Sequence, residues 1–452
     1  MTFRATNPYT GERGPGYAEH SSAEVAQKLA LAAEAQAAWA SLGPDARADY
    51  LARLARVLLE RKPLLAELAS WEMGKHLREA KAEVEKCAAC CRYYAEHGPG
   101  LLAEVPTAMA GGGVAAVGFR PLGLVLAIMP WNFPFWQVVR AAVPALLAGN
   151  ALVLKHAEVV PGCAQALEDA FEAAGFAPGL FTNLRLPHDR VEEVLAHPAV
   201  AALTLTGSER AGQAAGMLAA KYLKKQVLEL GGSDAFVVLQ DADLELAAAK
   251  AAESRMINTG QSCIAAKRFI VVKPLYEVFT ALLCEQLGGL VMGDPMQADV
   301  HFGPLVHPKA AGHLANQVER AVAAGARVRL AGGHAGGAMF RPVVLADVGP
   351  GNPAFDEELF GPVAAVACAQ DEADALRLAN ASAYGLGSSV WTRDRERGLA
   401  FARQMQCGGV YLNGVMKSDP ALPFGGVKRS GHGRELAVFG LHEFVNVQAV
   451  VG

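Results

Sequence analysis

The chain has 452 residues, of which 52% are hydrophobic and 19% charged, and its formal net charge is -4. This length exceeds one core of ordinary size, so two large lobes are expected, and the apolar content excludes a disordered chain. The small net charge gives no reason to expect nucleic acid or an anionic membrane as partner. No apolar run reaches the roughly 18 residues of a membrane-spanning helix, and no signal-peptide pattern opens the sequence. These features predict a soluble, cytoplasmic protein.

Residues 21–97 are predicted to form helices. The stretch 21–42 opens with a serine that suits a helix N-cap, and 44–75 has apolar residues at helical spacing. The next segment, 104–123, has short alternating stretches and glycines, which favour a hairpin or arm over core structure. Such an arm often reaches another subunit. At the other end of the chain, 444–452 has the pattern of one more strand.

The eight cysteines show no spacing of a disulfide framework. Cys87, Cys90 and Cys91 form a C-x-x-C-C pattern, which a metal site or a thiol redox sensor would also show. The surrounding residues 82–97 have helical spacing, and no second ligand pair follows at a useful distance. A reduced structural cluster is therefore favoured, and no metal is predicted.

From residue 124 onward, short apolar strands alternate with helices. The predicted strands are 124–129, 151–155, 180–184, 200–206 and 225–230. Apolar strands separated by helices are typical of a parallel sheet that is covered on both faces. Ligands bind such sheets at the carboxyl ends of the strands. The loops after Met129, Lys155 and Thr206 are therefore candidates for a binding site.

A second alternation begins at 234–239 and predicts a second α/β lobe. Cys263 falls in this lobe, in a loop between a helix that ends near Ile257 and a strand over 267–272. Most free cysteines are buried as small hydrophobes. Cys263, in "NTGQSCIAAKR", has small and polar neighbours instead, as a displayed nucleophile would. A turn that merely contains a cysteine is the alternative.

Three strand-end residues suit a nucleotide. Gly207 opens "GSERAG" between a strand and a helix, where a backbone can approach phosphate. The G-x-G-x-x-G fingerprint is absent there, and a tight turn is the alternative. Lys155 and Glu158, in "LKHAE", follow a strand and could grip ribose hydroxyls, or they could lie in a solvated loop.

Two further residues suit catalysis. Asn132 lies in "PWNFP", where prolines stiffen the turn and could aim its amide at a developing oxyanion. Glu229, in "LELGGSD", has apolar neighbours that would raise its pKa toward that of a general base. Alternatively, the Asn132 side chain would hydrogen-bond the backbone of its own turn, and Glu229 would form a structural ion pair. Two glycine-rich loops, 356–362 and 423–435, could close on a flat ligand or line a channel.

Six motifs, taken in chain order, resemble those of the NAD(P)-dependent aldehyde dehydrogenase superfamily, and the resemblance covers essentially the whole chain. The motifs are "PWNFP", "TLTGSERAG", "LELGG", "GQSC", "EELFGPV" and "PFGGVKRSG". "PWNFPFWQVVR" with "NTGQSCIAAKRFIV" is most similar to its short bacterial succinate-semialdehyde dehydrogenases. The resemblance implies an α/β fold with a Rossmann-like parallel-sheet cofactor lobe, a second α/β catalytic lobe and a β oligomerisation arm. The implied bounds are 1–103 with 124–230 for NAD(P) binding, 231–420 for catalysis, and 104–123 with 436–452 for the arm.

The resemblance also implies roles for the candidate residues. Cys263 would be the nucleophile, Asn132 would hold the oxyanion with the Cys263 N–H, and Glu229 would activate water to release a thioester. The implied cofactor-binding residues are Met129, Pro130, Trp131, Lys155, Glu158, Gly207, Ser208, Leu230, Glu358 and Phe360. The expected cofactor is NAD, with NADP possible, because a carboxylate at Glu158 would repel a 2′-phosphate.

The implied substrate is a small aldehyde that carries a carboxylate, most specifically succinate semialdehyde. Arg140 shares with Trp136 a helical face that could line the substrate tunnel, and it could bind that carboxylate, with Arg255 and Ser418 as further candidates. A surface or interface salt bridge is the alternative for Arg140. Alternatives are another aliphatic aldehyde, a non-catalytic relative, and a CoA-acylating enzyme, against which Glu229 argues. A homodimer or homotetramer is expected.

Overall fold

Four helices pack beside the first sheet before its central strands begin. In the computed structural model, which describes residues 2–452, the helices are α1 (Ser22–Ala40), α2 (Pro44–Glu60), α3 (Lys62–Met73) and α4 (Leu77–Leu101). A capping box starts α1, since Ser21 accepts from the Glu24 N–H and Glu24 accepts in return. Met1, the first residue of the expected cofactor-binding region, lies outside the described residues. The helices predicted over 21–97 are confirmed.

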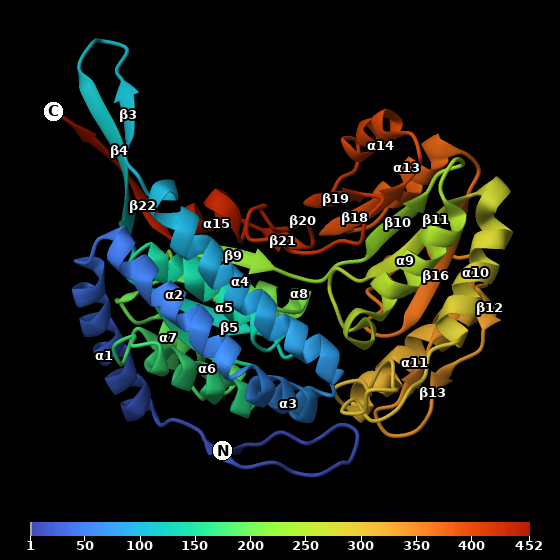
Figure 1. The fold of residues 1–452 in the computed structure, drawn as a ribbon, viewed down its shortest axis with the longest axis horizontal. Coiled ribbons are helices and arrows are strands. Elements are labelled where there is room, and N and C mark those ends of the chain that lie inside the picture. The colour runs from blue at the N-terminus through green and yellow to red at the C-terminus, as the bar shows by residue number, and fades with distance from the viewer. Residues whose placement is uncertain (1) are drawn as a thin grey trace.

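The first sheet contains the five predicted parallel strands (Figure 1). They are β5 (Leu124–Met129), β6 (Ala151–His156), β7 (Phe181–Asn183), β8 (Val200–Thr206) and β9 (Lys225–Glu229). Every residue of β5 and β6 is buried, because helices cover both faces. The intervening helices are α5 (Trp136–Leu147), α6 (Pro161–Ala173), α7 (Val191–Leu195) and α8 (Glu209–Lys221).

One further strand of this sheet escaped prediction. The short β21 (Gly431–His432) pairs antiparallel with β9 and brings the C-terminal glycine-rich loop against the end of that strand. Two residues are too few for any hydrophobic period, so only the tertiary structure reveals the pairing.

The second lobe is built on a seven-stranded sheet in the order β12-β15-β16-β11-β10-β18-β19. Its strands are β12 (Arg327–Leu330), β15 (Val343–Ala346), β16 (Val363–Ala369), β11 (Ala266–Val272), β10 (Asp234–Val238), β18 (Gly387–Trp391) and β19 (Gly409–Leu412). Its helices are α9 (Leu244–Met256), α10 (Tyr276–Gly288), α11 (Pro308–Ala323), α12 (Pro353–Asp356), α13 (Glu372–Asn380) and α14 (Arg395–Ala402). The predicted second α/β lobe is confirmed.

A three-stranded arm projects away from both sheets (Figure 1). It contains β3 (Val105–Ala108), β4 (Val114–Pro121) and the C-terminal β22 (Val445–Val451), which follows α15 (Ala437–Glu443). The hairpin and the last strand were both predicted, and their antiparallel pairing joins segments far apart in sequence. Within residues 2–452, no helix is long and apolar enough to span a bilayer.

The cysteines predicted to be structural lie inside the first lobe. Cys87, Cys90 and Cys91 are fully buried on α4, and burial raises the pKa of each thiol. None of the eight cysteines is in a disulfide, and no group of three or more potential metal ligands occurs in the described part of the chain. The sequence-derived division into cofactor, catalytic and arm regions stays a prediction.

Candidate active site

A cavity of about 360 Å³ opens where the carboxyl ends of the first sheet face the second lobe. Of the residues singled out from the sequence, its walls contain Pro130, Trp131, Asn132, Gly207, Ser208, Leu230, Cys263, Glu358 and Phe360. Residues that the sequence reasoning missed also line it: Gln137, Thr206, Gly231, Gln261, Ala310, His313, Leu314 and Gln317. The structure therefore gathers candidates from both lobes at one place, as the sheet-end rule requires.

The loop before Cys263 has an uncommon backbone. Asn258 and Thr259 are buried, non-glycine residues with φ of 52° and 56°, in the left-handed region. The Glu79 carboxylate accepts from the Asn258 N–H at 2.9 Å, and the Asn258 amide donates to the Asn132 carbonyl at 2.8 Å. Gly260 must be glycine, because an added Cβ would lie 2.4 Å from the carbonyl carbon of Gly361. These contacts hold a strained turn, as is common at functional sites.

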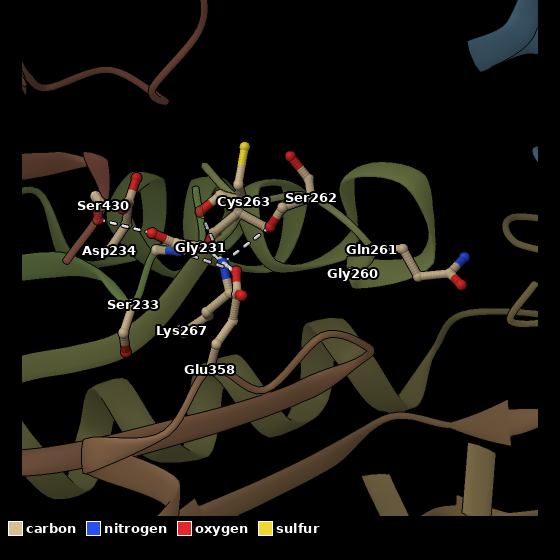
Figure 2. A network of polar contacts seen from close by, with 12 residues as sticks. Gly231, Ser233, Asp234, Gly260, Gln261, Ser262, Cys263, Lys267, Glu358 and Ser430 are labelled. Carbon is tan, nitrogen blue, oxygen red and sulfur yellow. Dashed lines mark hydrogen bonds and ion pairs between the residues drawn. The ribbon is translucent and has the colours of Figure 1, made fainter. Parts of the chain in front are cut away.

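Beneath Cys263, the buried ammonium of Lys267 binds the loop's backbone. Its Nζ donates to the carbonyls of Ser262 and Cys263 at 2.8 Å and to that of Ala265 at 3.1 Å. It also lies 3.5 Å from Oε1 of Glu358. Figure 2 shows this network on one side of the loop and the Cys263 sulfur pointing away from it. Lys267 thus fixes the backbone of Cys263 and leaves the thiol accessible.

The Cys263 thiol is half-buried. Burial raises its pKa to about 12, while the positive charges of Arg140 and Lys267 act to lower it. At neutral pH the sulfur therefore carries its proton in the unliganded protein, and a reaction at this sulfur needs a proton acceptor.

Asn132 lines the same cavity as this thiol. The side chain is buried, and its Nδ2 donates to the Gln261 carbonyl at 3.0 Å. An asparagine amide has two N–H groups, so one remains for a ligand. The hydrogen bond fixes the amide's position, which is what a preorganised oxyanion donor requires.

Glu229 lies at the end of β9 and is not among the residues that line this cavity. Neither of its buried carboxylate oxygens accepts a hydrogen bond from residues 2–452. Burial raises its pKa well above the ordinary value, the nearby Glu435 raises it further, and Arg140 acts to lower it. Gly425 packs against this carboxylate, where an added Cβ would lie 2.6 Å from Oε1. Glu229 is therefore a buried carboxyl whose pKa and freedom suit proton transfer.

Arg140 is paired inside the protein. Its Nε forms an ion pair with Oε2 of Glu435, its Nη2 donates to the Thr206 hydroxyl at 3.2 Å, and its guanidinium lies 4.6 Å from the Phe424 ring centre. Glu435 belongs to the glycine-rich stretch 423–435. The sequence predicts this stretch to be a loop but indicates no role for Glu435.

The other substrate candidates lie in two places. Trp136 Nε1 donates to the Ser418 hydroxyl at 3.0 Å, and Lys86 Nζ donates to the same hydroxyl at 2.7 Å. Arg255 is completely buried behind the nucleophile loop, where its Nη2 donates to the Gly260 carbonyl at 2.7 Å. Ser418 and Trp136 therefore form one cluster with Lys86, and Arg255 lies apart from it.

The cofactor candidates fit a dinucleotide in two segments. Ser208 caps α8 at the cavity wall next to Gly207, so a 13-residue helix points its N-terminus at the cavity. Trp131 and Phe360 stand edge to face, with ring centres 5.9 Å apart, beside Glu358, whose carboxylate accepts from the Gly232 N–H. Phosphate and a flat ring would both find suitable walls here.

Lys155 and Glu158 lie at the end of the adjacent strand β6. The Lys155 Nζ is buried, has no hydrogen-bond partner among the described residues and lies 3.8 Å from the Glu158 carboxylate. Glu158 is more exposed and lines a small second hollow. A buried ammonium that makes no hydrogen bond, beside an accessible carboxylate, fits the hydroxyls of a ribose. Met129 is buried at the end of β5, and its carbonyl lies 3.2 Å from Nδ1 of His156.

Three charged residues beyond the cavity walls were not singled out from the sequence either: Lys86, Lys267 and Glu435. Lys267 lies four positions after Cys263, and a lysine so close to a displayed cysteine is the one local signal available. Lys86 is far from the other site residues in sequence, so only the folded chain shows its proximity.

The sequence model described as the aldehyde dehydrogenase family matches residues 1–450. Succinate semialdehyde dehydrogenase (NAD(P)+) Sad of Escherichia coli is 45% identical over 446 residues, which cover 98% of this chain and 96% of that protein. Succinate-semialdehyde dehydrogenase (NADP(+)) of Deinococcus radiodurans is 47% identical over 451 residues, with 99% and 94% covered.

Solved structures agree with these sequence comparisons. The crystal structure of succinic semialdehyde dehydrogenase from Streptococcus pyogenes in complex with NADP+ has a TM-score of 0.97 at 35% identity, with 99% of each chain covered. The aldehyde dehydrogenase C mutant of Pseudomonas syringae, solved with NAD+ and octanal, has a TM-score of 0.95 at 31% identity, with 100% of this chain and 93% of that chain covered.

Proposed function

The chain belongs to the aldehyde dehydrogenase family, and on this premise we propose that it oxidises succinate semialdehyde to succinate with a nicotinamide dinucleotide. The observation that carries the proposal is the Cys263 thiol beside the Asn132 amide, in a cavity that also receives the N-terminus of α8. The names of relatives at 45% and 47% identity supply the substrate class.

The covalent chemistry centres on Cys263. Its sulfur gives up its proton to solvent as it attacks the aldehyde carbon, and the carbonyl oxygen of the resulting thiohemiacetal is an oxyanion. The free N–H of Asn132 and the backbone N–H of Cys263 donate to that oxyanion. Because Lys267 holds the Cys263 carbonyl, the adjacent backbone cannot swing away during the attack.

The cofactor, when bound, would accept the hydride whose loss from the thiohemiacetal carbon leaves a thioester on Cys263. Gly207 and Ser208 at the α8 N-terminus would hold its phosphates, and Glu358 and Phe360 would hold the nicotinamide end. Pro130, Trp131 and Leu230 would complete the walls of that pocket, with Met129 buried behind them at the end of β5, and Lys155 with Glu158 would bind the adenosine ribose.

Glu229 acts as the base that releases the acid. Once its carboxyl is deprotonated, a state that the positive charge of Arg140 favours, an unpartnered oxygen of Glu229 takes a proton from water as that water attacks the Cys263 thioester. The presence of this base favours hydrolysis over transfer of the acyl group to CoA.

Cofactor choice depends on Glu158. A carboxylate at that place accepts hydrogen bonds from two ribose hydroxyls and repels a 2′-phosphate, which favours NAD over NADP. Lys155 nearby has the opposite effect. Steady-state kcat/KM with each cofactor tests the proposal, and a preference for NADP would overturn the assignment of Glu158.

The substrate is tested with a panel of aldehydes of equal chain length, with and without a terminal carboxylate. We expect kcat/KM to be highest for succinate semialdehyde and lower for butanal, since the positive charges of Arg140 and Lys267 act at the Cys263 thiol and would attract an anionic substrate. Equal values for the two aldehydes would reduce the proposal to an unspecified aliphatic aldehyde dehydrogenase.

We further propose that the arm joins copies of this chain into a homodimer or homotetramer. Val114, Val447, Val450 and Val451 are exposed on its strands, and an exposed apolar strand face is unstable in water unless it is covered. Sedimentation of Val114→Lys with Val450→Lys should give a smaller species than the parent chain. An unchanged oligomer would rule out the arm as the contact. Eight unpaired cysteines fit the reducing cytoplasm, which cell fractionation would test.

A further inference from the structure

We propose that Lys86, with the Ser418 hydroxyl beside it, binds the carboxylate of the substrate and so sets the preference for aldehydes that carry an acid. This inference rests on the proposed function, and it assigns the specificity to a residue on α4 that no sequence pattern had singled out.

The ammonium of Lys86 lies in a built polar cluster. Its Nζ donates to the Ser418 hydroxyl at 2.7 Å and lies 4.3 Å from the ring centre of Trp136. Trp136 Nε1 donates to the same hydroxyl at 3.0 Å. Ser418 and Trp136 are buried, and Lys86 is half-buried, so the three side chains form a fixed wall with its charge near the surface.

Lys86 has no carboxylate partner within 4.0 Å among residues 2–452. Three almost completely buried cations, by contrast, form ion pairs with carboxylates. Lys75 forms an ion pair with Glu83, Arg140 with Glu435, and Lys267 with Glu358. A cation that has lost part of its hydration without an ion-pair partner gains more from an anionic ligand than a paired one does.

The position of Lys86 relative to the thiol also fits. Trp136 starts α5 four residues after Asn132, which lies beside the Cys263 loop, and Arg140 follows one turn later. Arg140 is close enough to influence the pKa of both Cys263 and Lys86. A short substrate with its aldehyde at Cys263 would thus extend toward Lys86 past a guanidinium already held by Glu435.

The two hydrogen-bonding groups suit a carboxylate. An ammonium donates to one oxygen and the Ser418 hydroxyl donates to the other, while the Trp136 ring packs along the lysine. An uncharged aldehyde of the same length leaves the ammonium without an anion. Lys86 therefore discriminates between aldehydes by charge.

The test compares kcat/KM for succinate semialdehyde and for butanal in the full-length enzyme. Lys86→Met should lower the ratio of these two values by roughly 10- to 100-fold, the usual cost of a lost charge-assisted hydrogen bond. Lys86→Arg should keep most of the ratio. Lys81→Met, which removes an exposed lysine of the same helix, is the matched control and should leave the ratio unchanged.

Two further measurements keep the outcomes distinct. Succinate should inhibit the parent enzyme competitively and inhibit Lys86→Met about 10-fold more weakly, and Ser418→Ala should show a smaller change in the same direction. If the parent enzyme prefers succinate semialdehyde and Lys86→Met keeps that preference, the assignment of Lys86 is overturned while the proposed function stands. If the parent enzyme shows no preference, both are overturned.

Discussion

The loop that carries Cys263 and the carboxyl cluster around Glu229 place buried polar groups in contrasting surroundings. In the loop, the Lys267 ammonium donates hydrogen bonds to three backbone carbonyls and forms an ion pair with a carboxylate. In the cluster, both oxygens of Glu229 lack a hydrogen-bond partner among the described residues. A nucleophile gains from a fixed backbone, whereas a base that must accept and release a proton gains from freedom. The rigid loop therefore serves the attack by Cys263, and the titratable Glu229 serves the release of the acid.

Removing the nucleophile has the largest expected effect. Cys263→Ala should lower turnover by more than about 1,000-fold, since no other group can form the covalent intermediate. Steady-state assays of NADH production measure this. Cys407→Ala is the matched control and should keep nearly full activity, because Cys407 lies away from the cavity. Comparable losses in the two variants would contradict a special role for Cys263.

The base is tested by separating the two halves of the reaction. Glu229→Gln should still release one NADH per site, and its steady rate should then fall by roughly 100-fold or more. Rapid mixing with absorbance detection resolves the two phases. Because the Glu229 carboxyl is buried without hydrogen bonds, the substitution should not lower the melting temperature. Undiminished steady turnover would require another base.

The rigidity of the nucleophile loop is tested at Lys267. Lys267→Met leaves three backbone carbonyls and the Glu358 carboxylate without their buried cationic partner, so it should lower the free energy of unfolding by about 3 kcal/mol. It should also slow the alkylation of Cys263 and reduce kcat more than it changes KM. Denaturant unfolding and iodoacetamide labelling measure these effects. Lys250→Met, at an exposed ion pair, is the control and should cost less than about 1 kcal/mol.

The smallest expected effect is a dependence of KM on pH. Burial and the charge of Arg140 lower the pKa of Lys86 to about 8, although Cys87, Glu83 and Cys90 act in the opposite direction. Lys86 is therefore charged below that pH and loses its charge above it. Burial keeps the thiols of Cys87 and Cys90 neutral in this range by raising their pKa.

KM for succinate semialdehyde should thus rise about 10-fold per unit as pH increases beyond the pKa of Lys86, and KM for butanal should not. Steady-state kinetics between neutral and alkaline pH measure both. A parallel rise for the two aldehydes would assign the titration to a group other than the one that binds the carboxylate.

The sequence predicted the parts of the fold that repeat a local pattern. All five parallel strands of the first sheet lie where apolar runs alternate with helices, and β8 has the predicted bounds, 200–206. Strands β15, β16 and β19 were not predicted, because their short apolar runs have no period that separates them from loops or helices.

The candidate site shows the same division. Cys263, Asn132 and Glu358 stand in motifs that a linear sequence displays, and all three line one cavity. The ion pair of Arg140 with Glu435 and the contact of Lys86 with Ser418 join residues about 300 positions apart. No periodicity specifies such pairs, since they arise only when the C-terminal loop packs on the first lobe.

The most direct test of this account is mass spectrometry of Glu229→Gln after brief reaction with succinate semialdehyde and cofactor, followed by acid quench and digestion. We expect a succinyl adduct on the peptide that contains Cys263, and no adduct when cofactor is left out or when Cys263→Ala is combined with this substitution. An adduct on another cysteine, or NADH release without any adduct, would contradict a covalent route through Cys263.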